Sequence, residues 1–404
     1  MPVSLHAIRA AARRIAGGLV VTPCPESIPL SEITGVRVFC KLDSLQRTGS
    51  FKERGARNAL LRLPAARKER GVVAASAGNH ALGLAYHGRL LGIPVTVVMP
   101  AYAPLIKIAT CRRLGARVLL HGAYFAAAQA EVDRLVLAEG LTRVHGFDDP
   151  DIIAGQGTMG LEILRQVPDV DAIVCPIGGA GLIAGLAVAV KALRPRVRMI
   201  GVESVATCSF TAALRAGRPV TIPRRSTLAD GLAVLRVGDN SFRLARPRVD
   251  RVVTVAEDWI ALAILRMVEL EKIVVEGAAA APLAALMAGR LPELRGRKVV
   301  LVVGGANIDP PTLGRVIETG MVADGRLTRF TAVISDRPGG LAELARVIAA
   351  SGASIQDIAH DRAFSGPDVS AVNVACTVET RDHAHIRELH RTLRRHGFPV
   401  TVAR

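Results

Sequence analysis

The sequence is poor in aromatic residues, which make up 3% of its 404 residues and include a single tryptophan. Proteins that bind nucleic acids commonly stack bases on aromatic side chains inside a dense basic patch. The chain has a formal net charge of +17, but its arginines are scattered singly or in short pairs. We therefore expect no nucleic-acid partner in spite of the charge.

Cysteine is also scarce, and none of the six cysteines forms a CxxC pair or another spacing typical of metal ligands. This pattern argues against a zinc site and against a disulfide framework. We expect no bound metal, and the cytoplasm, a reducing compartment, as the location. No signal peptide is predicted, because the opening segment LHAIRAAARRIAGG carries arginines and indicates an amphipathic helix.

Long apolar runs are absent except at residues 172–190, where nineteen residues carry no charge. That length approaches a membrane span. Pro176 and a glycine cluster at 178–181 interrupt the run, so a strand at 172–175, a loop and a buried helix explain the same composition. We therefore expect no membrane segment.

Strand-like and helix-like segments alternate between residues 36 and 310. The strand-like run VRVFCKL precedes FKERGARNALLRL, and DAIVC precedes LIAGLAVAVKAL. Such alternation predicts an α/β fold whose parallel sheets are covered by helices. Ligands of such folds bind beyond the carboxyl ends of the strands.

A smaller unit is predicted at the end of the chain. Residues 319–329 show no periodicity and are predicted to be a linker between a main part, 1–318, and a tail domain, 330–404. The tail predicts strand, helix, two strands, helix and strand, at 330–334, 341–350, 353–360, 369–378, 383–396 and 399–402. This βαββαβ order is typical of ferredoxin-like modules.

Lys52 occupies the most informative position among the seven lysines. Ser50 and Glu53 have the spacing of a capping box, which predicts Ser50 as the N-cap and Lys52 in the first helical turn. The positive end of the helix dipole lowers the pKa of a lysine there. Schiff-base chemistry requires the neutral amine. Lys52 is therefore a candidate for such chemistry, and a solvated surface lysine remains the alternative.

Three further turns follow predicted strands: SAGNH at 76–80, GGAGL at 178–182 and GGAN at 304–307. The first two precede predicted helices, whose N-terminal N–H groups bind carboxylate or phosphate. Because all the motifs lie at strand ends, they can converge on one crevice. A lysine of low pKa, an anion-binding turn and a phosphate loop are the pattern expected for pyridoxal phosphate (PLP).

The motifs resemble those of the threonine/serine dehydratases of the tryptophan-synthase β-like PLP family. The matching stretches, in family order over about residues 5–320, are KLDSLQRTGSFKERGARNAL, SAGNHALG, DDPDIIAGQGTMGLEI, PIGGAGLIAG, TLADGL, VVEGAAA and GGANID. The tail segment DRPGGLAELARVIAASGASI resembles an ACT domain, a small amino-acid-sensing module. The resemblance implies PLP fold type II, with two open parallel-sheet subdomains, followed by a ferredoxin-like ACT domain.

The resemblance also implies roles for single residues. Lys52 would carry the cofactor as a Schiff base, Phe51 would pack near its ring and Asn79 would bond the pyridoxal 3′-oxygen. Glu276 would lie near the ring. The phosphate would be held by Gly178, Gly179, Ala180, Gly181 and Leu182. The substrate carboxylate would be bound by Ser76, Ala77, Gly78, Asn79 and His80. An amino-acid effector would be bound by Asp336, Gly339, Gly340 and Leu341.

The implied reaction is that of a threonine ammonia-lyase, a carbon–nitrogen lyase. L-Threonine, and also L-serine, would yield a 2-oxo acid and ammonia, with Lys52 taking the α-proton. ACT modules pair across subunits, so a homodimer or homotetramer is expected. Serine racemisation, elimination from 3-hydroxyaspartate and a non-catalytic amino-acid-binding protein remain open alternatives.

The sequence departs from the family pattern at four positions. Gly304 stands where the family usually has a serine or cysteine that bonds the pyridine nitrogen, and Ala180 stands where glycine is usual. Ala77 replaces the serine base of related racemases, which favours elimination over racemisation. Of the acidic cation site after GVE in some relatives, only Glu203 remains.

Overall fold

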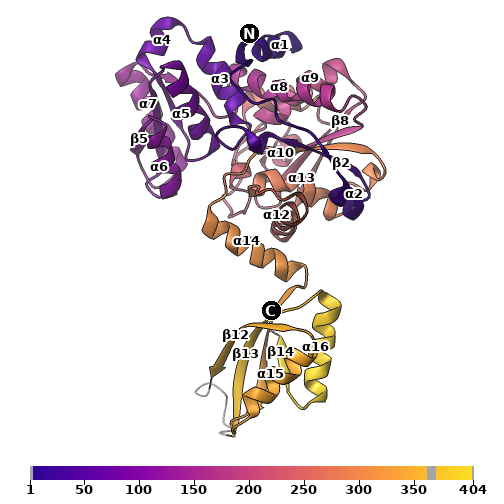
Figure 1. Cartoon of the computed structure of the whole chain (residues 1–404). Helices are drawn as coiled ribbons and strands as arrows, with labels where there is room; N and C mark the ends of the chain where they lie inside the picture. Colours follow the sequence, from indigo (N-terminus) through magenta and orange to yellow (C-terminus); the bar gives the residue numbers. More distant parts are fainter. Residues whose placement is uncertain (1–2, 362–369, 403–404) are drawn as a thin grey trace. The chain divides into compact units, whose positions relative to one another are not determined.

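The computed structural model describes residues 3–361 and 370–402 (Figure 1). It divides the chain into two compact units, Met1–Thr312 and Leu313–Arg404. Each unit is described by itself below.

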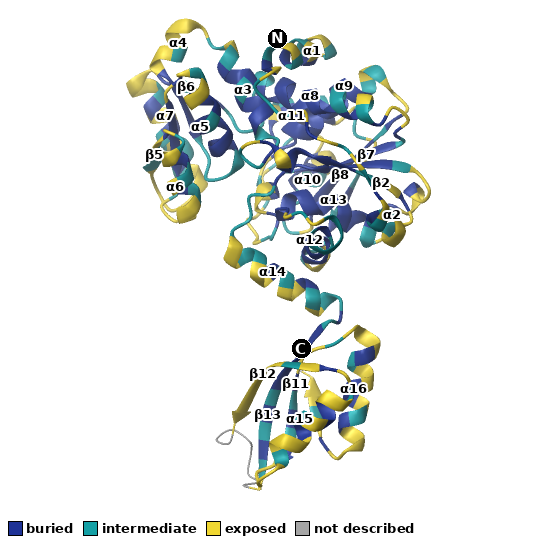
Figure 2. Ribbon diagram, viewed as in Figure 1, coloured by how far each residue is buried: buried dark blue, intermediate teal, exposed yellow. Residues whose placement is uncertain are grey.

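The larger sheet of the first unit has the strand order β1-β2-β10-β7-β8-β9. All neighbouring strands are parallel except β1, which pairs antiparallel with β2. The central strands β10, β7 and β8 are almost entirely buried (Figure 2), as expected for parallel strands covered by helices. The strands are β1 Glu26–Ser27, β2 Arg37–Leu42, β7 Ala172–Pro176, β8 Arg198–Ser204, β9 Arg251–Val255 and β10 Lys298–Val303.

The smaller sheet of this unit has the order β5-β4-β3-β6, and its strands are all parallel. They are β3 Val72–Ala75, β4 Val95–Met99, β5 Arg117–Leu120 and β6 Thr142–Arg143. Two open parallel sheets in one unit confirm the predicted α/β class with two subdomains.

Helices connect and cover these strands. They are α1 Leu5–Ile15, α2 Ile28–Thr34, α3 Lys52–Arg62, α4 Ala65–Arg70, α5 Asn79–Leu91, α6 Leu105–Arg113, α7 Phe125–Glu139, α8 Pro150–Gln166, α9 Gly181–Leu193, α10 Ser209–Ala216, α11 Asp239–Ala245, α12 Glu257–Glu271 and α13 Gly277–Met287. The predicted amphipathic helix at the start of the chain is α1, which buries Ile8, Ala11 and Ile15 on one face.

The charge-free run at 172–190 forms β7 and most of the buried helix α9. Among the described residues, the helices are too short or too polar to cross a bilayer. The run is apolar because both elements lie in the core of the first unit.

The second unit contains one antiparallel sheet of order β12-β13-β11-β14 with two helices. Its elements are β11 Leu327–Ser335, α15 Gly340–Ala350, β12 Ser354–Asp361, β13 Ala371–Glu379, α16 His383–Arg395 and β14 Val400–Val402. The βαββαβ order and the ferredoxin-like arrangement are confirmed. Val369, the predicted first residue of the third strand, lies outside the described residues.

The predicted linker at 319–329 differs from the structure. Helix α14, Pro310–Ala323, crosses the division between the units and continues into this segment, while Leu327 already pairs with Glu379 in the sheet. The pairing partner lies about fifty residues further along the chain, so local periodicity could not reveal this strand. The boundaries of functional domains remain a prediction.

Candidate active site

The segment before Lys52 is joined to the turn after β10. The backbone N–H of Phe51 donates to Gly304 O, and that of Ala306 donates to Gly49 O, each at 2.9 Å. Gly49 has φ 74°, a conformation that glycine adopts without strain. Two of the predicted motifs, more than 250 residues apart, therefore form one wall of a site.

The predicted capping box at Ser50 is wrong. Helix α3 begins at Lys52, its N-cap residue is Phe51, and no side chain caps it. Ser50 Oγ is buried and has no hydrogen-bond partner among the described residues. The Glu53 carboxylate accepts from the backbone N–H of Thr48 rather than of Ser50, and it contacts His87 Nε2 on another helix at 3.1 Å. Lys52 nevertheless lies in the first turn, as predicted.

Lys52 has the lowered pKa that its chemistry requires, for a reason that differs from the predicted one. Burial is the main cause, and it lowers the pKa of Lys52 to about 8, while the negative charge of Glu276 opposes the shift. Lys52 Nζ donates to Gly146 O at 2.7 Å and lies 5.3 Å from the centre of the Phe51 ring. The amine is thus held in one direction and is partly neutral near pH 8.

Asn79 and Glu276 meet beside this lysine. Asn79 Nδ2 donates to both carboxylate oxygens of Glu276, at 2.8 and 3.0 Å. Burial raises the pKa of Glu276 to about 7, against the effect of the Asn79 hydrogen bond. Asn307 Nδ2 donates to Asn79 Oδ1 and to Thr48 O, each at 2.8 Å. Glu276 and Asn307 thus hold the two ends of the Asn79 amide.

Asn307 belongs to the predicted GGAN turn but was given no role of its own, and Gly146 is absent from the predicted site. Asn307 follows directly on the Gly304 turn, and its place at a strand end was the available signal. Gly146 contributes a backbone carbonyl, which leaves no trace in a sequence pattern.

The predicted phosphate loop, residues 178–182, joins β7 to α9. A Cβ atom at Gly179 would collide with the Phe147 ring, and one at Gly181 would collide with Phe147 O. Ala180 is the N-cap of α9 and has φ 69°, which is unusual for a residue other than glycine. The two glycines therefore let the loop pack closely against Phe147 where it leads into the N-terminus of α9. The free N–H groups of a helix N-terminus bind phosphate.

The predicted carboxylate-binding turn, residues 76–80, joins β3 to α5. Ser76 Oγ accepts hydrogen bonds from the backbone N–H groups of Gly78 and Ala81, each at 3.3 Å. A Cβ atom at Gly78 would meet nothing within 4 Å, so the turn has open space beside it. Through Asn79 the turn belongs to the same site as Lys52.

His80, the last residue of this turn, is held inside the protein. Its Nε2 donates to Val144 O at 3.1 Å, and burial lowers its pKa to about 3, so the ring is neutral at pH 7. Its Nδ1 is buried and without a partner among the described residues. The side chain is thus 4% exposed and faces the interior rather than the turn's open side.

Two departures from the family pattern have a visible structural setting. A Cβ atom at Gly304 would lie 3.1 Å from Cδ1 of Phe51, so the aromatic ring occupies the direction a side chain would take. Position 304 offers no polar group to a cofactor ring. Ala77 likewise has only a methyl group to present at the site.

The predicted effector residues lie in the second unit, at the end of β11 and the start of α15. Gly339 is the N-cap of α15 with φ 96°, and Leu341 is 39% exposed. Asp336 N donates to Ser370 O, and Gly340 N donates to Arg337 O. These residues form a turn before a helix, as predicted, and are not part of the Lys52 site.

Glu203, the one acidic residue left of the cation-site pattern, binds backbone N–H groups through its carboxylate. It accepts hydrogen bonds from the N–H groups of Phe210 and Thr211, at 2.7 and 2.9 Å. It therefore caps the start of α10. In the described part of the chain, histidine, cysteine and acidic residues do not gather in threes as a metal site would require.

The residues around Lys52 fit PLP. The glycine-lined start of α9 suits a phosphate, and the fixed amide of Asn79 suits a ring hydroxyl. Thr48 Oγ1 and Ser50 Oγ are buried hydrogen-bonding atoms without partners among the described residues, in the segment that leads into Lys52. Two parallel-sheet subdomains with such a lysine and such a loop define a PLP-dependent enzyme of fold type II.

Comparison with known proteins agrees. The family described as pyridoxal-phosphate dependent enzyme matches residues 15–305. The chain belongs to this family, and its cofactor is PLP.

Some similar proteins match almost the whole chain, and others match about four fifths of it. It is 42% identical to L-threonine ammonia-lyase of Thermotoga maritima over 99% of both chains. It is also 42% identical to the catabolic L-threonine dehydratase of Escherichia coli, over 80% of this chain and 98% of that one. The structure of processed threonine deaminase isoform 2 from Solanum lycopersicum superimposes with a TM-score of 0.75 at 35% identity, over 79% of this chain and 95% of that chain.

Proposed function

We propose that this chain is a threonine ammonia-lyase, which converts L-threonine to 2-oxobutanoate and ammonia and L-serine to pyruvate and ammonia. The observation that carries the proposal is Lys52, a partly buried lysine whose pKa is lowered to about 8 and is influenced by the charge of Glu276, the partner of Asn79. The names of the relatives at 42% identity support the same substrate.

Each group of the site has a part in this reaction. Bound PLP supplies an aldehyde for the substrate amine and an electron-withdrawing ring. The loop at 178–182 would hold its phosphate, and Asn79 would orient the ring through its 3′-oxygen. The turn at 76–80 would bind the substrate carboxylate with backbone N–H groups.

Lys52 is the group proposed to remove the α-proton. Gly146 O accepts a hydrogen bond from Nζ and so fixes the direction of the amine. Departure of the β-hydroxyl with a proton loses one water, and hydrolysis to the 2-oxo acid and ammonia consumes one. The reaction therefore needs no redox partner.

Elimination is better supported than racemisation. A racemase needs an acid on the second face of the substrate, and Ala77 presents no ionisable group there. The solved serine racemase of Dictyostelium discoideum, with a TM-score of 0.72 at 32% identity, shares the fold of the first unit. Fold alone does not decide between the two reactions.

The second unit is proposed to be an ACT-like regulatory domain that binds an amino acid near Asp336, Gly339, Gly340 and Leu341. Its βαββαβ order and the exposed Leu341 support this role. We also propose a homodimer or homotetramer. The cytoplasm is the proposed location, because all six cysteines are unpaired and four of them are buried.

The decisive experiment measures keto acid from purified, PLP-loaded protein supplied with L-threonine. We expect 2-oxobutanoate and ammonia in equal amounts. Lys52→Ala should lose both turnover and the visible absorption band of the bound cofactor. Lys68→Ala, on the peripheral helix α4, is the matched control and should keep both. Full activity of Lys52→Ala would overturn the assignment.

A further inference from the structure

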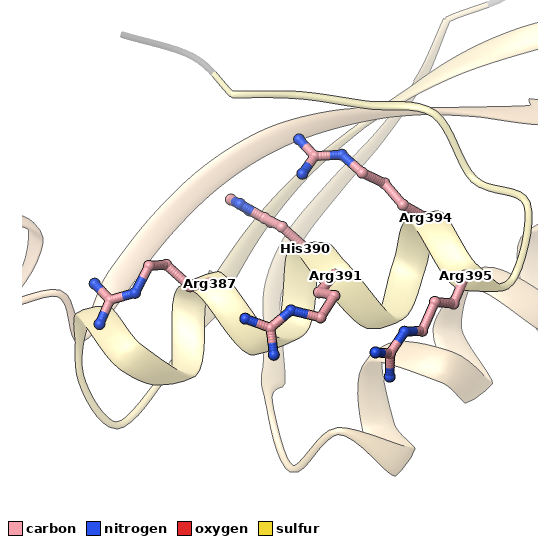
Figure 3. A pocket seen from close by; sticks show the side chains of 5 residues that line it. All are labelled: Arg387, His390, Arg391, Arg394 and Arg395. Carbon is pink, nitrogen blue, oxygen red and sulfur yellow. The ribbon is translucent and has the colours of Figure 1, made fainter.

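Helix α16 presents an unusually basic surface. Figure 3 shows five side chains that line a surface hollow of about 490 Å³ on this helix, namely Arg387, His390, Arg391, Arg394 and Arg395. We call these five residues the arginine face. It belongs to the second unit and to none of the sites described above.

The charge of the arginine face is not compensated within the described residues. Some arginines of exposed helix faces pair with carboxylates, as Arg346 of α15 does with Glu343 at 2.6 Å. No described carboxylate lies within 4.0 Å of the four arginines of the face. The one acidic residue of α16, Glu388, instead lies 4.0 Å from Arg381.

The spacing of the arginines makes this charge costly for the helix. Arg387, Arg391 and Arg395 are four residues apart, so they are neighbours on one face, where like charges destabilise a helix. Arg394 and Arg395 lie in the last turn, where the helix dipole favours cations. The dipole gives no such compensation to Arg387 and Arg391, which lie before that turn.

His390 points to a ligand independently of the charge. It is 7% exposed, its ring packs edge-on against Phe330 at 5.4 Å, and its Nε2 is buried without a hydrogen-bond partner among the described residues. A buried polar atom without a partner is rare and unfavourable, and with the ring proton on Nε2 this atom is a donor. Figure 3 shows its side chain between those of Arg387 and Arg394. An oxyanion in the hollow would supply the missing acceptor.

We propose that the arginine face binds a small anion that carries more than one phosphate group. Guanidinium groups match phosphate oxygens with two parallel hydrogen bonds, and lysines do not. Four guanidinium groups and a hollow of about 490 Å³ exceed what one phosphate group can occupy. The inference does not depend on the proposed reaction, because the face lies outside the catalytic unit.

The test is calorimetric titration of the full-length, PLP-loaded protein with pyrophosphate and with inorganic phosphate. Loading with PLP fills the catalytic phosphate loop, so that it does not contribute. We expect one saturable pyrophosphate site per chain, with inorganic phosphate at least tenfold weaker. The double variant Arg387→Gln and Arg391→Gln should weaken pyrophosphate binding at least tenfold.

Two further variants separate a specific site from general charge and from misfolding. Arg117→Gln with Arg134→Gln removes two exposed, paired arginines from the first unit and should leave binding unchanged. His390→Phe keeps an aromatic ring against Phe330 but removes the ring N–H, and should weaken binding several-fold with unchanged circular dichroism. The proposal is overturned by the absence of saturable binding, or by equal losses in the two double variants.

Discussion

Lys52 and Glu276 carry opposite charges in one buried site, and each has a displaced pKa. Burial lowers the pKa of Lys52 to about 8 and raises that of Glu276 to about 7. Only the neutral amine attacks the cofactor aldehyde. The rate at which cofactor-free protein takes up PLP should therefore rise with pH and level off above about 8. Stopped-flow absorbance measures this rate.

The sign of the coupling between the two residues gives a second check on this profile. The negative charge of Glu276 raises the pKa of Lys52. Glu276→Gln should therefore move the midpoint of the rate profile to lower pH, whereas Glu131→Gln, an exposed residue, should not move it. A midpoint at the ordinary lysine value of 10.5, or an upward shift in Glu276→Gln, contradicts the prediction.

Adding a single methyl group at Gly181 should disrupt the phosphate loop. A Cβ atom there would collide with the backbone oxygen of Phe147, which cannot rotate away. Gly181→Ala should lower the free energy of unfolding by about 2 kcal/mol or more and weaken PLP binding, because the loop must shift. Gly314→Ala is the control, since nothing lies within 4 Å of its Cβ position in α14. It should stabilise the protein by up to about 1 kcal/mol through helix propensity.

Urea unfolding and PLP titration of both glycine variants give the two readings. Equal stability of the Gly181 and Gly314 variants would show that the phosphate loop tolerates a side chain at position 181.

At the scale of the element, α3 is anchored by a buried ion network. Arg54 Nε contacts Asp43 Oδ2 at 2.6 Å and its Nη1 contacts Glu162 Oε1 at 2.7 Å, with the Arg54 side chain 1% exposed. Arg54→Met leaves the buried Asp43 carboxylate with the Thr22 hydroxyl but without a cationic partner, while Glu162 keeps Lys41. It should cost about 3–5 kcal/mol of stability. Arg62→Met removes an exposed pair with Asp151 from the same helix and should cost about 0–1 kcal/mol.

Chemical denaturation of the cofactor-free protein, followed by circular dichroism, compares these two variants. Similar midpoints for both would mean that the buried network does not hold the first turn of α3.

The elements themselves were predictable where their signal is local. Alternating apolar runs and glycine-rich turns predicted both parallel sheets and the βαββαβ tail. A buried strand is recognisable from a short run of consecutive apolar residues. The cap of α3 was not predictable. The Ser50 and Glu53 spacing is a local signal, but Glu53 contacts His87, which lies 34 residues away in the chain. A buried contact of that kind outweighs a local rule.

The candidate site shows the same division. Asn79 and the loop at 178–182 were predictable because each follows closely on a strand. Lys52 lies well beyond the end of β2 at Leu42 and was singled out by the Ser50 and Glu53 spacing and by the family resemblance. The bond between Asn307 and Asn79 joins residues 228 positions apart, and no local pattern encodes it. The cause of the low pKa of Lys52 could not be predicted from the sequence either, because burial of the amine depends on how the whole unit packs around it.

At the scale of the whole molecule, the two units have separate cores, and the relatives differ in the same way. The Escherichia coli relative is covered to 98% by 323 residues of alignment, whereas the Thermotoga maritima relative matches 99% of this chain. The alignment with the Escherichia coli relative suggests a test of whether the first unit of this chain folds without the second unit. We therefore expect a chain ending at residue 324, which retains α14, to bind PLP and to turn over threonine within about twofold of the full-length rate, since few contacts cross a domain boundary.

The same truncation tests the regulatory role proposed for the second unit. A panel of amino acids, added to the full-length enzyme in the keto-acid assay, should include at least one that changes its rate. That response should vanish in the chain ending at 324, and it should weaken in full-length Asp336→Asn if the effector is bound at the turn before α15. A truncated enzyme that still responds would place the effector in the first unit. If the full-length enzyme shows no response to any amino acid of the panel, the tail has no sensing role.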